Sequence, residues 1–227
     1  MILPEQEFWD VFKKTNGALS CCEAIAIMNL ASMAPLMEVG EKKTTAGQYL
    51  EMGTHKGKSA MAAIAALPQP GLFLMLDPEF ENEEWEKETH EAISEVQEMT
   101  ERRLIVRALV PQYSLDFLQK NPNLMFSWVF SDAGSHQYGL PMAEVELLED
   151  RIVPHGIIAF HDFDSQFKEV RYSYDYLLST GKYEEVPIPW EEIKNYAREH
   201  DLEKSNLSWH HEELDFPCFV GALKRKP

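Results

Sequence analysis

The stretch that decides the fold is Tyr49–Ser59, YLEMGTHKGKS, which predicts a short apolar strand ending in an acid, then a glycine turn, then a helix. Gly53 and Gly57 leave the backbone of the turn open to a ligand. The helix that follows offers unpaired N–H groups in its first turn. Glu51, at the strand end, can accept hydrogen bonds from hydroxyls or an amine. The stretch predicts a cradle for a small molecule, with an ordinary tight turn as the alternative.

The spacing of this stretch, ExGxxxGxS, narrows the class of ligand. It lacks the closely spaced glycine pair and the third glycine of the dinucleotide fingerprint. Lys58 and Ser59 are not preceded by the glycine spacing of a Walker A loop. A cofactor with a bulky adenosine but no pyrophosphate therefore fits best.

Acids also close other apolar runs of the chain. Asp77 ends the run GLFLMLD, and Asp132 and Asp162 each follow a predicted strand within residues 125–162. A carboxylate at the carboxyl end of a strand can accept two hydroxyl donors, as in nucleotide sites of α/β proteins. For Asp77 the alternative is a helix N-cap or a solvated turn. Asp132 and Asp162 follow successive strands, so we expect them to flank one crevice.

These segments resemble the class I S-adenosylmethionine-dependent methyltransferases, and ExGxxxGxS is similar to the first motif of their small-molecule O-methyltransferases. The resemblance covers roughly residues 40 to 225. It implies a doubly wound, Rossmann-like α/β fold with a seven-stranded mixed sheet whose last strand is antiparallel. It implies S-adenosylmethionine as cofactor. The cofactor-binding residues that it implies are Glu51, Gly53, Thr54, Gly57, Ser59, Asp77, Ser114 and Asp132.

Two of these assignments rest on the family's arrangement. Asp77 matches the acid that holds the ribose hydroxyls, and Ser114 matches a polar residue placed against the adenine. A helix N-cap is the alternative for Ser114, and both roles can hold together.

The resemblance also implies a divalent metal. In metal-dependent relatives, including those that resemble macrocin and sugar O-methyltransferases, the positions of Asp132 and Asp162 carry the metal ligands. Carboxylate oxygens with bound waters suit magnesium. His161 as a further ligand would favour manganese, iron or zinc, because imidazole is a softer donor. The alternative is a partly buried histidine that bonds a neighbouring carbonyl.

The catalytic residues predicted are Asp132, His136 and His161, but the general base stays open. Similar proteins usually carry a histidine or an acid two or three residues after the first metal acid. Here Gly134 and Ser135 occupy those places, and His136 comes one residue later.

Composition excludes several classes of function. The net charge of −17 repels phosphate backbones, and no basic cluster longer than 224–226 offsets it, so nucleic acid is a poor substrate. No apolar run of about 18 residues predicts a membrane span. The N-terminus lacks the pattern of an export signal. Cys21, Cys22 and Cys218 form no disulfide framework, so we expect a reducing cytoplasm.

The chain divides into a helical cap at residues 1–45 and a methyltransferase domain at 46–227, with a lid insertion near 189–216. The insertion is longer than a typical connector. In related methyltransferases the N-terminal segment covers the cofactor and shapes the substrate mouth or a dimer contact, which leaves a homodimer open.

The expected reaction is methyl transfer from S-adenosylmethionine to a hydroxyl of a small molecule of sugar, polyketide or phenolic type, assisted by magnesium or manganese. Three alternatives remain. One is a metal-independent methyltransferase in which His136 or His161 is the base. Another is a nicotinamide oxidoreductase, which the absence of GxGxxG disfavours. The third is a non-catalytic binding or assembly protein that keeps the fold.

Overall fold

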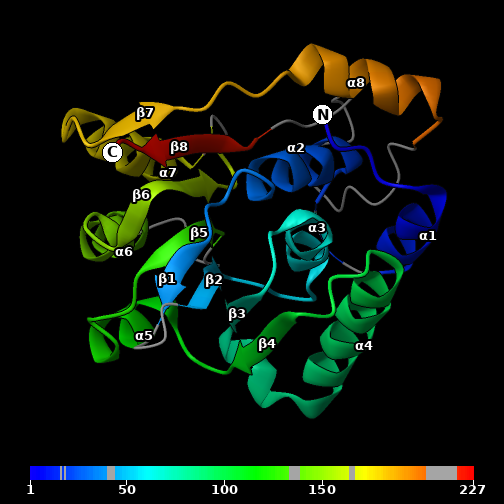
Figure 1. The fold of residues 1–227 in the computed structure, drawn as a ribbon, viewed down its shortest axis with the longest axis horizontal. Coiled ribbons are helices and arrows are strands. Elements are labelled where there is room, and N and C mark those ends of the chain that lie inside the picture. The colour runs from blue at the N-terminus through cyan, green and yellow to red at the C-terminus, as the bar shows by residue number, and fades with distance from the viewer. Residues whose placement is uncertain (16, 18, 40–43, 133–138, 164–166, 203–218) are drawn as a thin grey trace.

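The computed structural model describes residues 1–15, 17, 19–39, 44–132, 139–163, 167–202 and 219–227 (Figure 1). His136, Cys218 and residues 203–216 of the predicted lid insertion lie outside these residues. The helices and strands follow in the order α1 (Gln6–Lys14), α2 (Cys21–Ala31), β1 (Met37–Val39), β2 (Thr44–Met52), α3 (Lys58–Ala66), β3 (Gly71–Leu76), the 3₁₀ helix η1 (Pro78–Glu81), α4 (Glu83–Met99), β4 (Ile105–Val110), α5 (Ser114–Lys120), β5 (Phe126–Ser131), α6 (Leu140–Leu148), β6 (Ile152–Phe160), α7 (Lys168–Ser179), β7 (Tyr183–Glu185), α8 (Trp190–Glu199) and β8 (Gly221–Arg225).

One mixed sheet forms the middle of the molecule. Its strands are arranged in the order β4-β3-β2-β5-β6-β8-β7, and the short β1 pairs with β2 outside this path. The strands β4, β3, β2, β5 and β6 are parallel to one another, whereas β8 is antiparallel to both β6 and β7. The predicted doubly wound fold with seven strands in the main path and an antiparallel last strand is confirmed.

The order of the strands fixes where a ligand can bind. The chain runs outward from β2 through β3 to β4, then returns to place β5 on the other side of β2. In open α/β sheets, ligands bind at the carboxyl ends of the strands on either side of such a reversal. The crevice between the carboxyl ends of β2 and β5 is therefore the expected site.

Alternating side chains of the central strands pack into two hydrophobic cores, one on each face of the sheet. Tyr49 of β2 belongs to the core shared with α1, α2, α3, α4 and α8. Leu50, the next residue, belongs to the core shared with α5, α6 and α7. Both side chains are fully buried, as a strand covered on both faces requires. The result is a three-layer arrangement of helices around the sheet (Figure 1).

The N-terminal segment packs as part of this structure. A capping box begins α2, in which Ser20 and Glu23 each accept a hydrogen bond from the backbone of the other. The helix is apolar on nearly all sides and is buried along most of its length, against α3 in particular. The helical part of the predicted cap ends at Ala31, and β1 follows at Met37.

No helix among the described residues is long and apolar enough to cross a membrane.

Candidate active site

The glycine turn after β2 is built on two residues in the left-handed region. Gly53 has a φ of 82° and Gly57 a φ of 81°, values that residues with a Cβ rarely adopt. The N–H of Gly57 donates a 2.8 Å hydrogen bond to the carbonyl of Thr54, which closes the turn. The helix α3 then starts at Lys58. The backbone conformation of the predicted cradle therefore favours glycine at both positions.

Glu51 lies at the bottom of this cradle and is completely buried. The hydroxyl of Ser59, in the first turn of α3, donates a hydrogen bond to Glu51 Oε1. The pKa of Glu51 is raised to about 8, chiefly by burial; the bond from Ser59 opposes this shift, and the nearby charges of Asp132 and Asp77 add to it. Within the described residues, neither Glu51 Oε2 nor the buried Thr54 Oγ1 has a hydrogen-bond partner. Such atoms are costly unless a ligand or water pairs with them.

Asp77 connects the end of β3 to the glycine turn. Its Oδ2 accepts a 2.6 Å hydrogen bond from the backbone N–H of His55, and its Oδ1 accepts a 2.9 Å bond from that of Glu79. The N-cap alternative for Asp77 is therefore realised, at the start of η1. Each carboxylate oxygen has a second lone pair, so a ribose hydroxyl can still be accepted.

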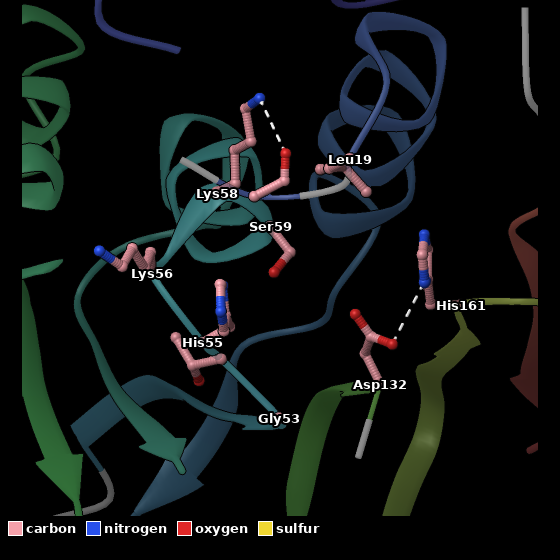
Figure 2. A pocket seen from close by; sticks show the side chains of 10 residues that line it. Leu19, Gly53, His55, Lys56, Lys58, Ser59, Asp132 and His161 are labelled. Atoms are coloured by element: carbon pink, nitrogen blue, oxygen red, sulfur yellow. Dashed lines mark hydrogen bonds and ion pairs between the residues drawn. The ribbon is translucent and has the colours of Figure 1, made fainter. Parts of the chain in front are cut away.

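A pocket with an empty volume of about 350 Å³ opens above the turn, at the carboxyl ends of β2, β5 and β6. Figure 2 shows His55 and Lys56 on one side of it and Asp132 with His161 on the other. The residues that line it are Gly17, Leu19, Gly53, Thr54, His55, Lys56, Lys58, Ser59, Asp132 and His161. The pocket lies where the strand order reverses, as expected for a ligand site.

Asp132, His161 and Asp162 form the one group of three or more metal-ligand side chains found among the described residues. One ligand atom from each lies within 4.8 Å of the others. His161 Nδ1 is 3.2 Å from Asp132 Oδ1 and 3.7 Å from Asp162 Oδ2. The structure therefore brings together the three predicted metal ligands, and His161 faces carboxylates instead of the neighbouring carbonyl of the alternative reading.

The charge around His161 favours a cation at this point. Burial lowers the pKa of His161, but the charge of Asp132 and the contacts with Asp132, Asp162 and Glu23 outweigh it and hold the pKa well above 6.5. Either the imidazolium or a metal ion with neutral imidazole as ligand can balance the acids. A histidine that holds its proton this firmly is a poor general base.

Two other predicted site residues are placed differently. Ser114 is buried at the start of α5, where its hydroxyl donates to Glu144 Oε1 on α6, and it is absent from the described pocket lining. Its N-cap alternative is wrong by one position, because Tyr113 is the N-cap. His136 lies outside the described residues, so its role as base stays a prediction.

Several residues at the site are not among those predicted from the sequence. Gly17 and Leu19, between α1 and α2, line the pocket, and so does Lys58. Lys58 Nζ donates a 3.4 Å hydrogen bond to the carbonyl of Gly17 and lies 4.4 Å from the centre of the Phe12 ring. Burial lowers the pKa of Lys58 to about 8. Glu23 of α2 contacts His161, and this contact has no signature in the local sequence.

The comparisons agree with this geometry. The family model of a methyltransferase domain matches residues 50–163, half of the chain, which includes the glycine turn and the strand-end acids Glu51, Asp77, Asp132 and Asp162. No curated protein matches the sequence.

Solved structures share the fold along nearly the whole chain. One is the O-methyltransferase from Bacillus cereus in complex with SAH, with 14% identity over 99% of this chain and 93% of that one, at a TM-score of 0.61. Another is the O-methyltransferase TomG from Streptomyces achromogenes, involved in tomaymycin synthesis and solved with SAM, with 16% identity over 99% and 92% and a TM-score of 0.58. The predicted resemblance is confirmed in family and fold: this chain belongs to the methyltransferase family.

Proposed function

We propose that this protein transfers a methyl group from S-adenosylmethionine to a hydroxyl of a small molecule, with help from a divalent metal. The observation that carries the proposal is the pocket at the reversal of strand order, with Glu51 near the end of β2 and with Asp77 and Asp132 directly after β3 and β5, the two neighbours of β2. The acceptor classes that fit this proposal are sugars, polyketides and phenolic natural products.

The charge of the pocket supports this cofactor. S-adenosylmethionine carries a sulfonium and an ammonium group, and the three acids around the turn repel one another unless a cation or proton intervenes. The raised pKa of Glu51 reflects that repulsion together with burial. Within the described residues, Glu51 Oε2 and Thr54 Oγ1 have no hydrogen-bond partner, and Thr54 lines the pocket.

The metal fits the donor set beside the pocket. Asp132 and Asp162 offer oxygens and His161 offers Nδ1, and these atoms lie close enough together to share one ion. Two carboxylates and an imidazole suit manganese, and magnesium if waters complete the shell. A divalent ion bound there would lower the pKa of the acceptor hydroxyl.

The protein's own residues align the reactants in this proposal. Gly53 lines the pocket and allows the cofactor to approach the backbone, Asp77 would hold the ribose, and Asp132 lines the pocket beside His161. The transferred methyl leaves a neutral thioether, so the leaving group needs no acid. Most of the rate enhancement then comes from holding the nucleophile, methyl carbon and sulfur in line.

Calorimetry with S-adenosylmethionine, with and without Mg²⁺ or Mn²⁺, tests the proposal. We expect the parent to bind the cofactor, and Asp162→Ala to keep that binding but lose binding of Mn²⁺. Formation of S-adenosylhomocysteine with a panel of sugars and phenols then tests turnover. A parent that fails to bind the cofactor contradicts the proposal. Cofactor binding without turnover of any acceptor would favour a non-catalytic binding protein, and turnover in chelator would favour a metal-independent enzyme.

A further inference from the structure

Glu23 is a buried carboxylate that α2 brings to the metal-ligand group. It is 1% exposed, although it is the third residue of a capping box, a position that normally lies near the surface. Its Oε2 accepts a 2.9 Å hydrogen bond from the N–H of Ser20 within the box. Its Oε1 accepts a 3.0 Å bond from the N–H of Phe219, just before β8. Two segments distant in sequence therefore hold this side chain in place.

The imidazole of His161 lies between carboxylates on both of its nitrogens. Nδ1 faces Asp132 at 3.2 Å and Asp162 at 3.7 Å. On the other side, Nε2 lies 3.6 Å from Glu23 Oε1, an ion-pair distance longer than a hydrogen bond. Nε2 is buried and has no hydrogen-bond partner within the described residues, so Glu23 is the group placed to stabilise a proton on it.

We propose that Glu23 is a positioning residue, which holds the Nε2 side of His161 so that Nδ1 is presented to Asp132 and Asp162. A histidine that binds a metal through one nitrogen nearly always gives the proton on the other to a carboxylate, a carbonyl or a water, which fixes the tautomer and the ring. Glu23 occupies that place. The inference rests on the metal site of the proposed function.

This arrangement links the N-terminal segment to the chemistry. Glu23 is anchored by Ser20 at the start of α2 and by Phe219 before β8, so both segments contribute to the orientation of His161. The same segment supplies Gly17 and Leu19 to the pocket. The N-terminal helices therefore complete the site in addition to covering it.

Binding of Mn²⁺ to the full chain, counted as free ion by electron paramagnetic resonance, tests this role in Glu23→Gln. The variant keeps the size of the side chain and removes its charge. We expect its affinity for Mn²⁺ to fall by about 10–100-fold, the usual effect of losing such a partner. Binding of S-adenosylmethionine by calorimetry should stay at the parent level.

The matched control is Ser20→Ala. It removes the hydroxyl that accepts the hydrogen bond from the N–H of Glu23, and it leaves the carboxylate of Glu23 and its bond from the Ser20 N–H in place. It should lower the melting temperature and leave Mn²⁺ affinity unchanged. Parent-like Mn²⁺ binding by Glu23→Gln, or an equal loss in Ser20→Ala, overturns the inference.

Nitrogen NMR of the His161 ring at a single pH gives a second readout that needs no metal. The Nε2 shift should change in Glu23→Gln and stay constant in Ser20→Ala. An unchanged Nε2 shift overturns the role of Glu23 even if the parent binds no Mn²⁺. A parent that binds neither Mn²⁺ nor S-adenosylmethionine contradicts the proposed function instead, so the two failures are distinct.

Discussion

The backbone N–H of His55 donates a 2.6 Å hydrogen bond to Asp77 Oδ2, and this bond joins the glycine turn after β2 to the end of β3. The other oxygen of Asp77 accepts the N–H of Glu79 at the start of η1. One carboxylate therefore fixes the shape of the cradle. The proposed function assigns the same side chain to the ribose of the cofactor, so we expect substitution to affect both stability and binding.

Asp77→Ala should weaken the binding of S-adenosylmethionine by about 1–3 kcal/mol, because charged hydrogen bonds to the ligand are lost. It should also lower the melting temperature, since the N–H groups of His55 and Glu79 lose their acceptor. Calorimetry and thermal unfolding separate the two effects. Glu79→Ala is the control, because it keeps the backbone N–H that Asp77 binds. Parent-like affinity in Asp77→Ala would show that the cradle is wrongly placed.

Glu51→Gln should change how stability depends on pH. The pKa of Glu51 is about 8 in the folded protein and 4.5 ordinarily, so the folded state holds the proton more tightly. Stability should therefore fall as pH rises from about 4.5 to about 8, by up to about 1.4 kcal/mol for each unit of the pKa shift. The glutamine variant cannot ionise, so its melting temperature should exceed that of the parent increasingly toward pH 8. Parallel melting curves across this range would contradict the prediction.

Gly57→Ala should destabilise the protein more than Gly181→Ala. Both glycines have positive φ, 81° and 73°, and a residue with a Cβ in that region costs roughly 1–2 kcal/mol. A Cβ at Gly57 would also lie 2.8 Å from Thr89 Cγ2, whereas one at Gly181 meets nothing within 4 Å. Denaturant midpoints measure the difference. Equal losses in the two variants would show that Thr89 moves aside without cost.

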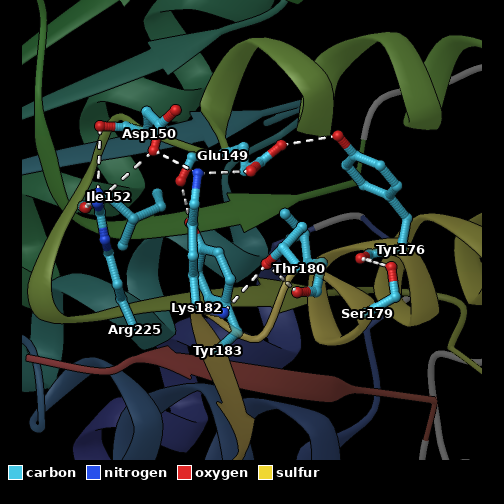
Figure 3. A network of polar contacts seen from close by, with 10 residues as sticks. Glu149, Asp150, Ile152, Tyr176, Ser179, Thr180, Lys182, Tyr183 and Arg225 are labelled. Atoms are coloured by element: carbon cyan, nitrogen blue, oxygen red, sulfur yellow. Dashed lines mark hydrogen bonds and ion pairs between the residues drawn. The ribbon is translucent and has the colours of Figure 1, made fainter.

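Lys182→Ala should remove a network that ties β7 to the loop before β6. Lys182 Nζ lies 2.7 Å from Glu149 Oε1 and 2.8 Å from Asp150 Oδ1, and Arg225 approaches the same Asp150 (Figure 3). Hydrogen bonds from Lys182 lower the pKa of both acids, so the contribution is present above their ordinary pKa near 4 and is lost as pH falls.

Thermal unfolding of Lys182→Ala should therefore show a loss at neutral pH that shrinks in acid and in high salt. Lys87→Ala is the control, because Lys87 and Glu91 form a solvent-exposed pair 3.8 Å apart on α4. A loss in Lys182→Ala that is the same at pH 3 and pH 7 would contradict an ionic origin.

Much of the fold follows from local sequence. The apolar run at 126–131 predicts a strand, which is β5, and the periodic pattern at 83–101 predicts a helix, which is α4 and ends at Met99. Pro154 and Gly156 indicate a turn, so the local sequence predicts a strand only from Gly156. In the structure β6 starts earlier, at Ile152. In the structure the register against β5 shifts there, and the strand continues through the irregularity. Tertiary pairing with β5 overrides the local signal of proline and glycine.

Two elements, β1 and α8, depend on tertiary packing for a related reason. β1 has only three residues and exists through its pairing with β2. The helix α8 lies within the segment read as a lid insertion, and its buried residue Ile193 belongs to the core that α2 shares. Short elements whose stability comes from packing carry a weak signal in the sequence.

Local sequence predicts the glycine turn, the acid-ended strands and the residues around them, because glycine conformation and strand periodicity are local properties. Tertiary packing brings Ser114 to Glu144, and it brings Glu23 to His161 across 138 positions of chain. Those contacts depend on how the helices pack against the sheet. Residue spacing does not reveal such contacts between elements. Burial of a whole helix face sets the position of the helix, and the position of each of its side chains follows from that.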